Sequence, residues 1–253
     1  MYGKPCRLPK GGILLRPHWQ YHIKRTGQRR ARNCCDGSAR AAPLLHQLAS
    51  TYSSCVEQPV QRLFVALSAL LDHKIYGGDA ADAFAHSPGP DVPTYVSIDD
   101  AYAEWYEERQ KTSLDRSLVL PVKRALQGHP ESGKLFQRHI DKIITSPELN
   151  FRATVLDRSL YRTEYEGETV LLLRQLDDFA LSCNSETVAN EIVGIIVKKL
   201  QLPNEDNPPF EVFGLVKDFD GVLLEQRHGY IKIHYSCYID RLLRTHKWDT
   251  DTF

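Results

Sequence analysis

The most distinctive feature of the hydrophobic pattern is a long apolar run that two adjacent carboxylates interrupt. The apolar positions on either side are Val170, Leu171, Leu172, Leu173, Leu176, Phe179, Ala180 and Leu181. A run of this length, bounded by polar residues, predicts buried β-structure. Because Asp tolerates tight turns, we expect two strands to meet at Asp177 and Asp178.

This turn would carry two negative charges at the tip of a buried hairpin. Like charges repel strongly where the dielectric constant is low, so Asp177 and Asp178 would need a compensating cation. A divalent metal ion is one such cation. The alternative is an ordinary hairpin with its Asp-Asp turn on the surface, and this segment alone leaves both interpretations open.

The rest of the pattern predicts a mixture of helices and antiparallel strands. Apolar residues near a helical period predict helices at residues 40–50, 57–72, 133–146, 186–200 and 236–245, with Ser185 capping the fourth. Strands are expected within residues 13–35 (two, joined at Thr26 and Gly27), 73–76, 118–122, 159–165, 169–183, 210–216 and 221–224, and a polar loop at 204–209. The fold class is therefore α+β: an antiparallel sheet backed by helices, with a β-rich N-terminal lobe.

Composition narrows the class of protein. The chain has 253 residues, of which 42% are hydrophobic and 25% charged, as in soluble globular proteins. No run approaches the roughly 18 apolar residues of a membrane span, so no membrane partner is expected. Six cysteines form no Cys-x-x-Cys pair, which argues against a zinc ribbon and for reduced, intracellular thiols. We expect a cytoplasmic location, with the nucleus as the open alternative.

Charge is distributed unevenly along the chain although the net charge is zero. Residues 1–40 hold ten Lys and Arg against one acidic residue, Asp36, and the remainder carries a net charge of −9. A basic end suits a polyanion on one face of the protein. The alternative is a solvated tail, but Trp19, Tyr21 and Ile23 accompany the charge, which favours a folded surface.

Three segments in a fixed order resemble the catalytic motifs of reverse transcriptases. Residues 79–85 are similar to the first motif, Asp-x-x-Asp-Ala-aromatic, and the segment with Asp177 and Asp178 is similar to the third, aromatic-x-Asp-Asp. Between them, residues 124–133 resemble the nucleotide-binding Gln-Gly motif. Residues 8–12, 19–32 and 213–231 match the opening hairpin and closing strands of the copia-type retrotransposon polymerase. The resemblance covers residues 7–245.

This resemblance implies the right-hand fold of a polymerase with a β-rich fingers lobe. The fingers would comprise approximately residues 7–72 and 87–124, and the palm residues 73–86 and 125–209. Closing strands and at most a partial thumb would occupy residues 210–245.

The resemblance also implies a two-metal site. Asp79 and Asp177 would bridge two Mg²⁺ ions, Asp178 would support the ion on the primer side, and the main-chain carbonyl of Ala80 would complete the nucleotide side. Mg²⁺ prefers such hard oxygen ligands, and Mn²⁺ is a possible substitute. Two ions of this kind can activate an attacking 3′-hydroxyl and stabilise a pyrophosphate leaving group.

The nucleotide would be held by residues outside this trio of carboxylates. Phe84 matches the aromatic residue beneath the incoming sugar, where a ring excludes a 2′-hydroxyl, although an ordinary core Phe is the alternative. Gln127 and Gly128 match the Gln-Gly pair, with a surface loop as the alternative. Arg32, or alternatively Lys24 or Arg30, matches the basic fingers residue that holds the triphosphate.

We therefore expect an RNA- and DNA-directed DNA polymerase that takes a template-primer and deoxynucleoside triphosphates, with other retrotransposon proteins as possible partners. The usual Tyr-Val before the aspartates is Gln175 and Leu176 here, and Lys134 and Phe136 also depart from the pattern. These departures keep open an alternative: a catalytically silent, truncated or domesticated remnant that binds nucleic acid. Primer extension with Mg²⁺ separates the two.

Overall fold

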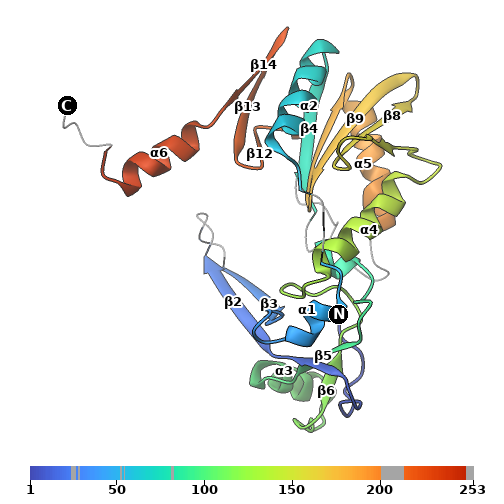
Figure 1. Ribbon diagram of the computed structural model, residues 1–253, viewed down its shortest axis with the longest axis vertical. Helices are drawn as coiled ribbons and strands as arrows, with labels where there is room; N and C mark the ends of the chain where they lie inside the picture. The colour runs from blue at the N-terminus through green and yellow to red at the C-terminus, as the bar shows by residue number, and fades with distance from the viewer. Residues whose placement is uncertain are drawn as a thin grey trace. The chain divides into compact units, whose positions relative to one another are not determined.

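The computed structural model describes residues 1–23, 27, 29–51, 53, 55–80, 83–200 and 214–248, without the side chains of Arg30 and Asp79. The chain divides into two compact units, each made of two separate segments. Unit 1 comprises residues 1–53 and 82–140, and unit 2 comprises residues 54–81 and 141–253. The described residues form six α-helices and several small sheets, which confirms the α+β class (Figure 1).

Unit 1 contains two small β-structures and four helical segments. Its elements are β1 (Ile13–Leu15), β2 (Pro17–Ile23), β3 (Arg29–Cys35), α1 (Pro43–Leu48), the 3₁₀ turn η1 (Ala83–His86), β5 (Thr94–Ser97), α3 (Asp100–Gln110), β6 (Val119–Pro121) and most of α4 (Ser132–Ile144). The sheet order is β1-β5-β6, with β1 parallel and β6 antiparallel to β5. Strands β2 and β3 form a separate antiparallel ribbon.

The core of unit 1 joins the sheet to α1. Its buried members include Leu15, Leu45, Val96 and Leu126, each at most 2% exposed. Cys35, at the end of β3, belongs to the same cluster. The basic N-terminal segment is therefore folded into strands that pack on a core, and the interpretation as a solvated tail is wrong. Lys24 and Thr26 lie outside the described residues.

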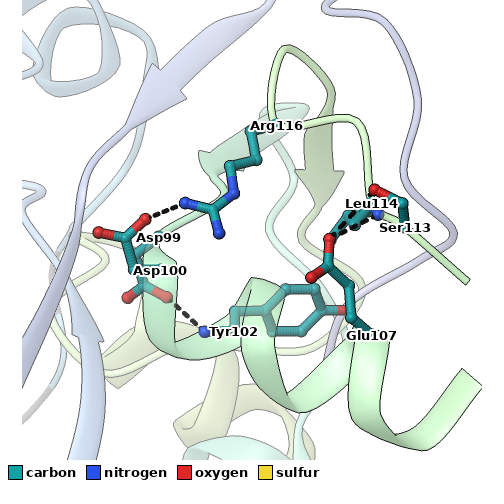
Figure 2. A network of polar contacts seen from close by, with 7 residues as sticks. All are labelled: Asp99, Asp100, Tyr102, Glu107, Ser113, Leu114 and Arg116. Carbon is teal, nitrogen blue, oxygen red and sulfur yellow. Dashed lines mark hydrogen bonds and ion pairs between the residues drawn. The ribbon is translucent and has the colours of Figure 1, made fainter. Parts of the chain in front are cut away.

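Helix α3 was not predicted from the hydrophobic pattern, because its residues are mostly acidic and aromatic. Its N-cap, Asp99, accepts a hydrogen bond from the Tyr102 backbone N–H at 2.8 Å and another from the Trp19 indole Nε1–H at 2.6 Å. The Glu107 carboxylate accepts from the Leu114 N–H at 2.8 Å, so the loop that follows is fastened to the helix (Figure 2). Polar end contacts, rather than an apolar stripe, fix this helix.

Unit 2 is built on a six-stranded antiparallel sheet in the order β11-β4-β10-β9-β8-β7. Its elements are α2 (Gln58–Leu70), β4 (Lys74–Asp79), β7 (Arg152–Ala153), β8 (Leu160–Tyr165), β9 (Glu168–Gln175), β10 (Asp178–Cys183), α5 (Glu186–Leu200), β11 (Gly214–Leu215), β12 (Asp218–Phe219), β13 (Val222–Arg227), β14 (Tyr230–His234) and α6 (Ser236–Thr245). Strands β12, β13 and β14 form a small antiparallel sheet of their own.

Helix α2 packs between these two sheets of unit 2 (Figure 1). Its buried positions are Gln61, Phe64, Val65 and Ser68, the i, i+3, i+4, i+7 spacing of one helix face. Phe64 and Val65 share a cluster with residues of β4, β9 and β10, and with Phe219 and Leu224 of the small sheet. The Gln61 side-chain amide donates to the Phe219 carbonyl at 3.0 Å, which satisfies the one buried amide of this face.

The meander β8–β9–β10 and the flanking helices agree with the sequence prediction. A two-residue turn, Glu166 and Gly167, joins β8 to β9, and both residues have positive φ, as in the turns that suit hairpins. The Ser185 hydroxyl accepts from the Thr187 N–H at 3.1 Å, which confirms it as the N-cap of α5. The polar loop predicted at 204–209 and the strand residues 210–213 lie outside the described residues.

The division into units does not coincide with the predicted lobe boundaries. The chain passes between units after residues 53, 81 and 140, whereas the predicted boundaries lie near residues 72, 86 and 124. Helix α2, placed in the fingers by the prediction, packs on the sheet that carries β4 and β10. The assignment of the two units to fingers and palm stays a prediction.

The role of Asp99 predicts that replacing it destabilises the protein more than replacing its neighbour Asp100. Asp99→Ala removes both the helix cap and the acceptor for Trp19, so we expect a loss of about 2 kcal/mol in the free energy of unfolding. Asp100→Ala is the matched control, because Asp100 forms an exposed ion pair with Arg116 and its loss should cost at most about 0.5 kcal/mol. Urea denaturation measures both; equal losses would show that Asp99 does not hold α3.

Candidate active site

The turn of the Asp-Asp hairpin lies one residue earlier than predicted. Strands β9 and β10 are joined by Leu176 and Asp177, and Asp178 is the first residue of β10, paired with Gln175. The prediction that the strands meet at Asp177 and Asp178 is therefore wrong by one position. The physical reason is that β4 extends far enough to give Asp178 a second partner, which keeps it within the sheet.

Strand β4 brings the first predicted motif to this hairpin. Asp79, the last residue of β4, pairs directly with Asp178, although 99 positions separate them in the sequence. Directly paired residues of antiparallel strands have Cα atoms about 4.5–5.5 Å apart. The next residue, Ala80, donates its backbone N–H to the Asp177 carbonyl at 2.9 Å. The backbones of Asp79, Ala80, Asp177 and Asp178 therefore meet at one end of the sheet.

The carboxylates of the hairpin are accessible to a ligand. Asp177 is exposed and Asp178 half-buried, while the strands behind them are buried. Carboxylate and main-chain oxygens are the hard donors that Mg²⁺ prefers, so this donor set fits the ion. Among the side chains that the structure describes, no group of three His, Cys, Asp or Glu is arranged to hold a metal. The Asp79 side chain is not among those described, so this finding does not test the predicted trio.

Two residues just before the turn have contacts that the motif did not predict. The Gln175 side-chain carbonyl accepts a hydrogen bond from the Val56 backbone N–H at 2.6 Å, which ties the turn to the segment before α2. Arg174 is 1% exposed, within an otherwise apolar strand. The sequence signal for Arg174 is a single charge that follows a run of leucines.

The predicted Gln-Gly motif packs against the end of β3. The Gln127 carbonyl accepts from the Cys35 N–H at 2.8 Å, and a Cβ at position 128 would lie 2.1 Å from the Cys35 carbonyl oxygen. Gly128 also has φ +87°, so two independent constraints require glycine there. Burial raises the pKa of the Cys35 thiol to about 12, so Cys35 packs as a neutral side chain.

A buried histidine fixes the other side of this loop. Burial lowers the pKa of His129 to about 4, which leaves the ring neutral at physiological pH. Its Nε2 is 3.1 Å from the Thr94 hydroxyl, and its Nδ1 accepts from the Glu131 N–H at 3.2 Å. The loop with Gln127 and Gly128 is therefore held by β3 on one side and β5 on the other.

In the β2–β3 ribbon, the positions of Arg32 and Arg30 lie on the face opposite Trp19 and Tyr21, whereas Arg29, paired with Ile23, is on the face of Trp19 and Tyr21. Arg32 pairs with Gln20, and Arg30 pairs with His22, so these register positions share one face. Trp19 and Tyr21 occupy the other face, with ring centroids 6.3 Å apart and planes at 16°. Arg32 is half-buried; the side chain of Arg30 and the whole of Lys24 lie outside the description. The choice of Arg32, Arg30 or Lys24 as the triphosphate residue stays a prediction.

Phe84 lies in η1 and is half-buried. Its ring meets the fully buried Phe136 edge to face, with centroids 6.4 Å apart and planes at 81°. Part of the ring thus packs on the core and part remains accessible. Phe84, Gln127 and Arg32 belong to unit 1, and the carboxylates belong to unit 2.

No protein-family model matches the chain, and no curated protein matches it. Among the helices of the described residues, none is both long and apolar enough to cross a membrane. The assignment of function therefore depends on the residues and their geometry.

The close approach of Gly128 to Cys35 predicts that alanine destabilises the protein more at position 128 than at position 167. Gly128→Ala should reduce the free energy of unfolding by about 3 kcal/mol or more, because a Cβ adds steric overlap with Cys35 to the strain of positive φ. Gly167→Ala is the control: its φ is also positive, but no atom lies within 4 Å of the added Cβ, so about 1–2 kcal/mol is expected. Thermal melting of the two variants gives the comparison; similar melting temperatures would contradict the packing of the loop on β3.

Proposed function

We propose that the chain is a copia-type reverse transcriptase domain that adds deoxynucleotides to a primer on an RNA or DNA template. The observation that carries this proposal is the pairing of Asp79 with Asp178 beside the bond from Ala80 to Asp177. Two motifs distant in the sequence supply carboxylate residues to one sheet end, as the resemblance requires. The antiparallel sheet of unit 2 would then be the palm, and the β-rich unit 1 would contribute the fingers.

The reaction requires the primer 3′-oxygen to attack the α-phosphate while pyrophosphate leaves. Bound Mg²⁺ ions, held by Asp79, Asp177, Asp178 and the Ala80 carbonyl, would neutralise the phosphate charge and lower the pKa of the attacking hydroxyl. The three carboxylates would hold the reacting groups at the sheet end, where the exposed Asp177 can be reached from solvent. Positioning and charge stabilisation are the main contributions a protein makes to phosphoryl chemistry.

Residues of unit 1 would select and hold the nucleotide. The loop with Gln127 and Gly128 is bonded to β3 on one side and β5 on the other, and its backbone would contact the incoming nucleotide. Arg32, Arg30 or Lys24 would bind the triphosphate, because a guanidinium or ammonium group compensates phosphate charge. The accessible part of the Phe84 ring would exclude a 2′-hydroxyl.

A catalytically silent nucleic-acid-binding protein is the second candidate. Gln175 and Leu176 replace the residues usual before the aspartates, while the β2–β3 ribbon carries both stacked aromatic rings and basic residues. Aromatic stacking and positive charge suffice for binding single-stranded nucleic acid. Such a protein would bind a primed template without extending it.

Replacing Asp177 tests the proposed activity. Asp177→Asn keeps the shape of the side chain but removes its charge, so we expect primer extension with Mg²⁺ to fall by orders of magnitude while template-primer binding remains. Asp240→Asn, an exposed change on α6, is the matched control and should extend normally. Extension by Asp177→Asn at the rate of the unaltered protein would exclude the assigned role. Binding without extension by the unaltered protein, in Mg²⁺ and in Mn²⁺, would favour the silent protein.

Replacing Phe84 tests the choice of sugar. If the ring lies beneath the ribose, Phe84→Ala should incorporate ribonucleotides more readily than the unaltered protein and still incorporate deoxynucleotides, because only a steric block is lost. Phe84→Leu retains much of the bulk and should give an intermediate discrimination. The measurement is the ratio of kcat/KM for the two sugars. An unchanged ratio in an active Phe84→Ala protein would assign the ring to core packing alone.

A further inference from the structure

Arg174 is a buried cation next to the Asp-Asp hairpin. It lies in β9 after three leucines, and its side chain has no accessible surface. Arginine is almost never fully buried unless a partner compensates its charge. An apolar residue would suit the strand better, so the charge at this position needs a physical explanation.

The partners of Arg174 only partly satisfy the guanidinium. Its Nη2 is 3.7 Å from the Asp141 Oδ1, which is an ion pair but too long for a hydrogen bond. Within the described part of the chain, Nε and Nη2 have no hydrogen-bond partner. The Asp141 Oδ1 is itself held by the Tyr161 hydroxyl, which donates to it at 2.6 Å. Burial raises the pKa of Tyr161 to about 12, so the phenol keeps the proton that it donates.

Arg174 also contacts the turn. Its Nη1 donates to the Leu176 carbonyl at 3.4 Å. Leu176 has φ +53°, a left-handed conformation that is uncommon for a residue with a branched side chain and that needs support from its surroundings. The following carbonyl, that of Asp177, accepts from the Ala80 N–H. The backbone of Asp177 is therefore held on both sides, by Arg174 through the preceding peptide and by Ala80 through the next.

We propose that Arg174 is a positioning residue that fixes the peptide between Leu176 and Asp177, so that Asp177 and Asp178 keep one orientation at the sheet end. Asp141 and Tyr161 orient the guanidinium from the opposite side. The consequence for catalysis rests on the proposed polymerase function, whereas the positioning of the turn does not.

Arg174→Met tests this role, because it keeps the length of the side chain and removes both charge and donors. Arg174→Lys keeps the charge but not the planar fork of donors. Arg162→Met is the matched control: Arg162 lies on the neighbouring strand β8, is 62% exposed and pairs with the exposed Glu164. Two amides report on the backbone by hydrogen exchange: Ala80, bonded to the Asp177 carbonyl, and Val216, bonded to the Ile75 carbonyl at 2.9 Å farther along β4.

In Arg174→Met we expect faster exchange at Ala80 and unchanged exchange at Val216. On a primed template kcat should fall roughly a hundredfold, the size of effect that a small displacement of catalytic groups produces, with KM for the nucleotide changed by only a few-fold. Arg174→Lys should lie between Arg174→Met and the unaltered protein in both measurements. Arg162→Met should match the unaltered protein.

If the ion pair of Arg174 with Asp141 contributes only to the stability of the fold, a different result is expected. Such an ion pair predicts a lower melting temperature for Arg174→Met with the exchange rate of Ala80 unchanged relative to Val216, and that outcome would overturn the proposal.

If Arg174→Met does not fold, Tyr161→Phe replaces it: loss of the bond to Asp141 should loosen the guanidinium, speed exchange at Ala80 and lower kcat several-fold. If Tyr161→Phe changes neither the exchange rate of Ala80 nor kcat, the proposal is wrong. If the unaltered protein extends no primer, the polymerase proposal fails, and the exchange at Ala80 still decides the role of Arg174.

Discussion

The pairing of β4 with β10 is the interaction on which the candidate site depends. It places residue 79 opposite residue 178 and lets Ala80 bond to the carbonyl of Asp177. The close approach depends on Gly77, where a Cβ would lie 2.6 Å from the Phe179 carbonyl oxygen and 2.4 Å from a methyl group of Val216. Because β4 lies between β10 and β11, a displacement of this strand would disturb both neighbours and the core beneath α2.

The hairpin shows how a sheet can hold a strained turn. Leu176 adopts a left-handed conformation because the surrounding contacts fix the chain on each side of it: Gln175 is held by Val56, and Asp178 is paired with both β9 and β4. Strain of this kind persists only where neighbouring interactions outweigh it, and it is frequent at functional sites. The stability of the sheet thus supports a conformation that the isolated loop would not keep.

Much of the fold follows from hydrophobic periodicity, and the elements that this pattern does not predict, or places wrongly, have physical causes. The apolar spacing of α2, α4 and α5 and the alternation in β8 predict those elements, because each has one face in a core. Helix α3 escapes this reasoning, since its ends are fixed by Asp99 and Glu107 rather than by an apolar face. The turn was misplaced by one residue because local turn preference favours Asp, whereas the partner strand decided the register. Contacts such as that of Gln127 with Cys35 join residues far apart in the chain, and no local pattern encodes them.

Each unit is made of two separate segments of the chain, and this arrangement affects how the chain folds. Unit 1 needs residues on both sides of the segment that holds α2 and β4, and unit 2 cannot complete its sheet until β10, about a hundred residues after β4, has been made. During synthesis on the ribosome, β4 would therefore emerge well before the partners that cover its edges. Folding dominated by such distant contacts is slow, and unpaired strand edges promote aggregation while it proceeds. A gene fragment cut at residue 81 would encode neither unit whole, whereas residues 1–140 contain all of unit 1 only together with α2 and β4 of unit 2.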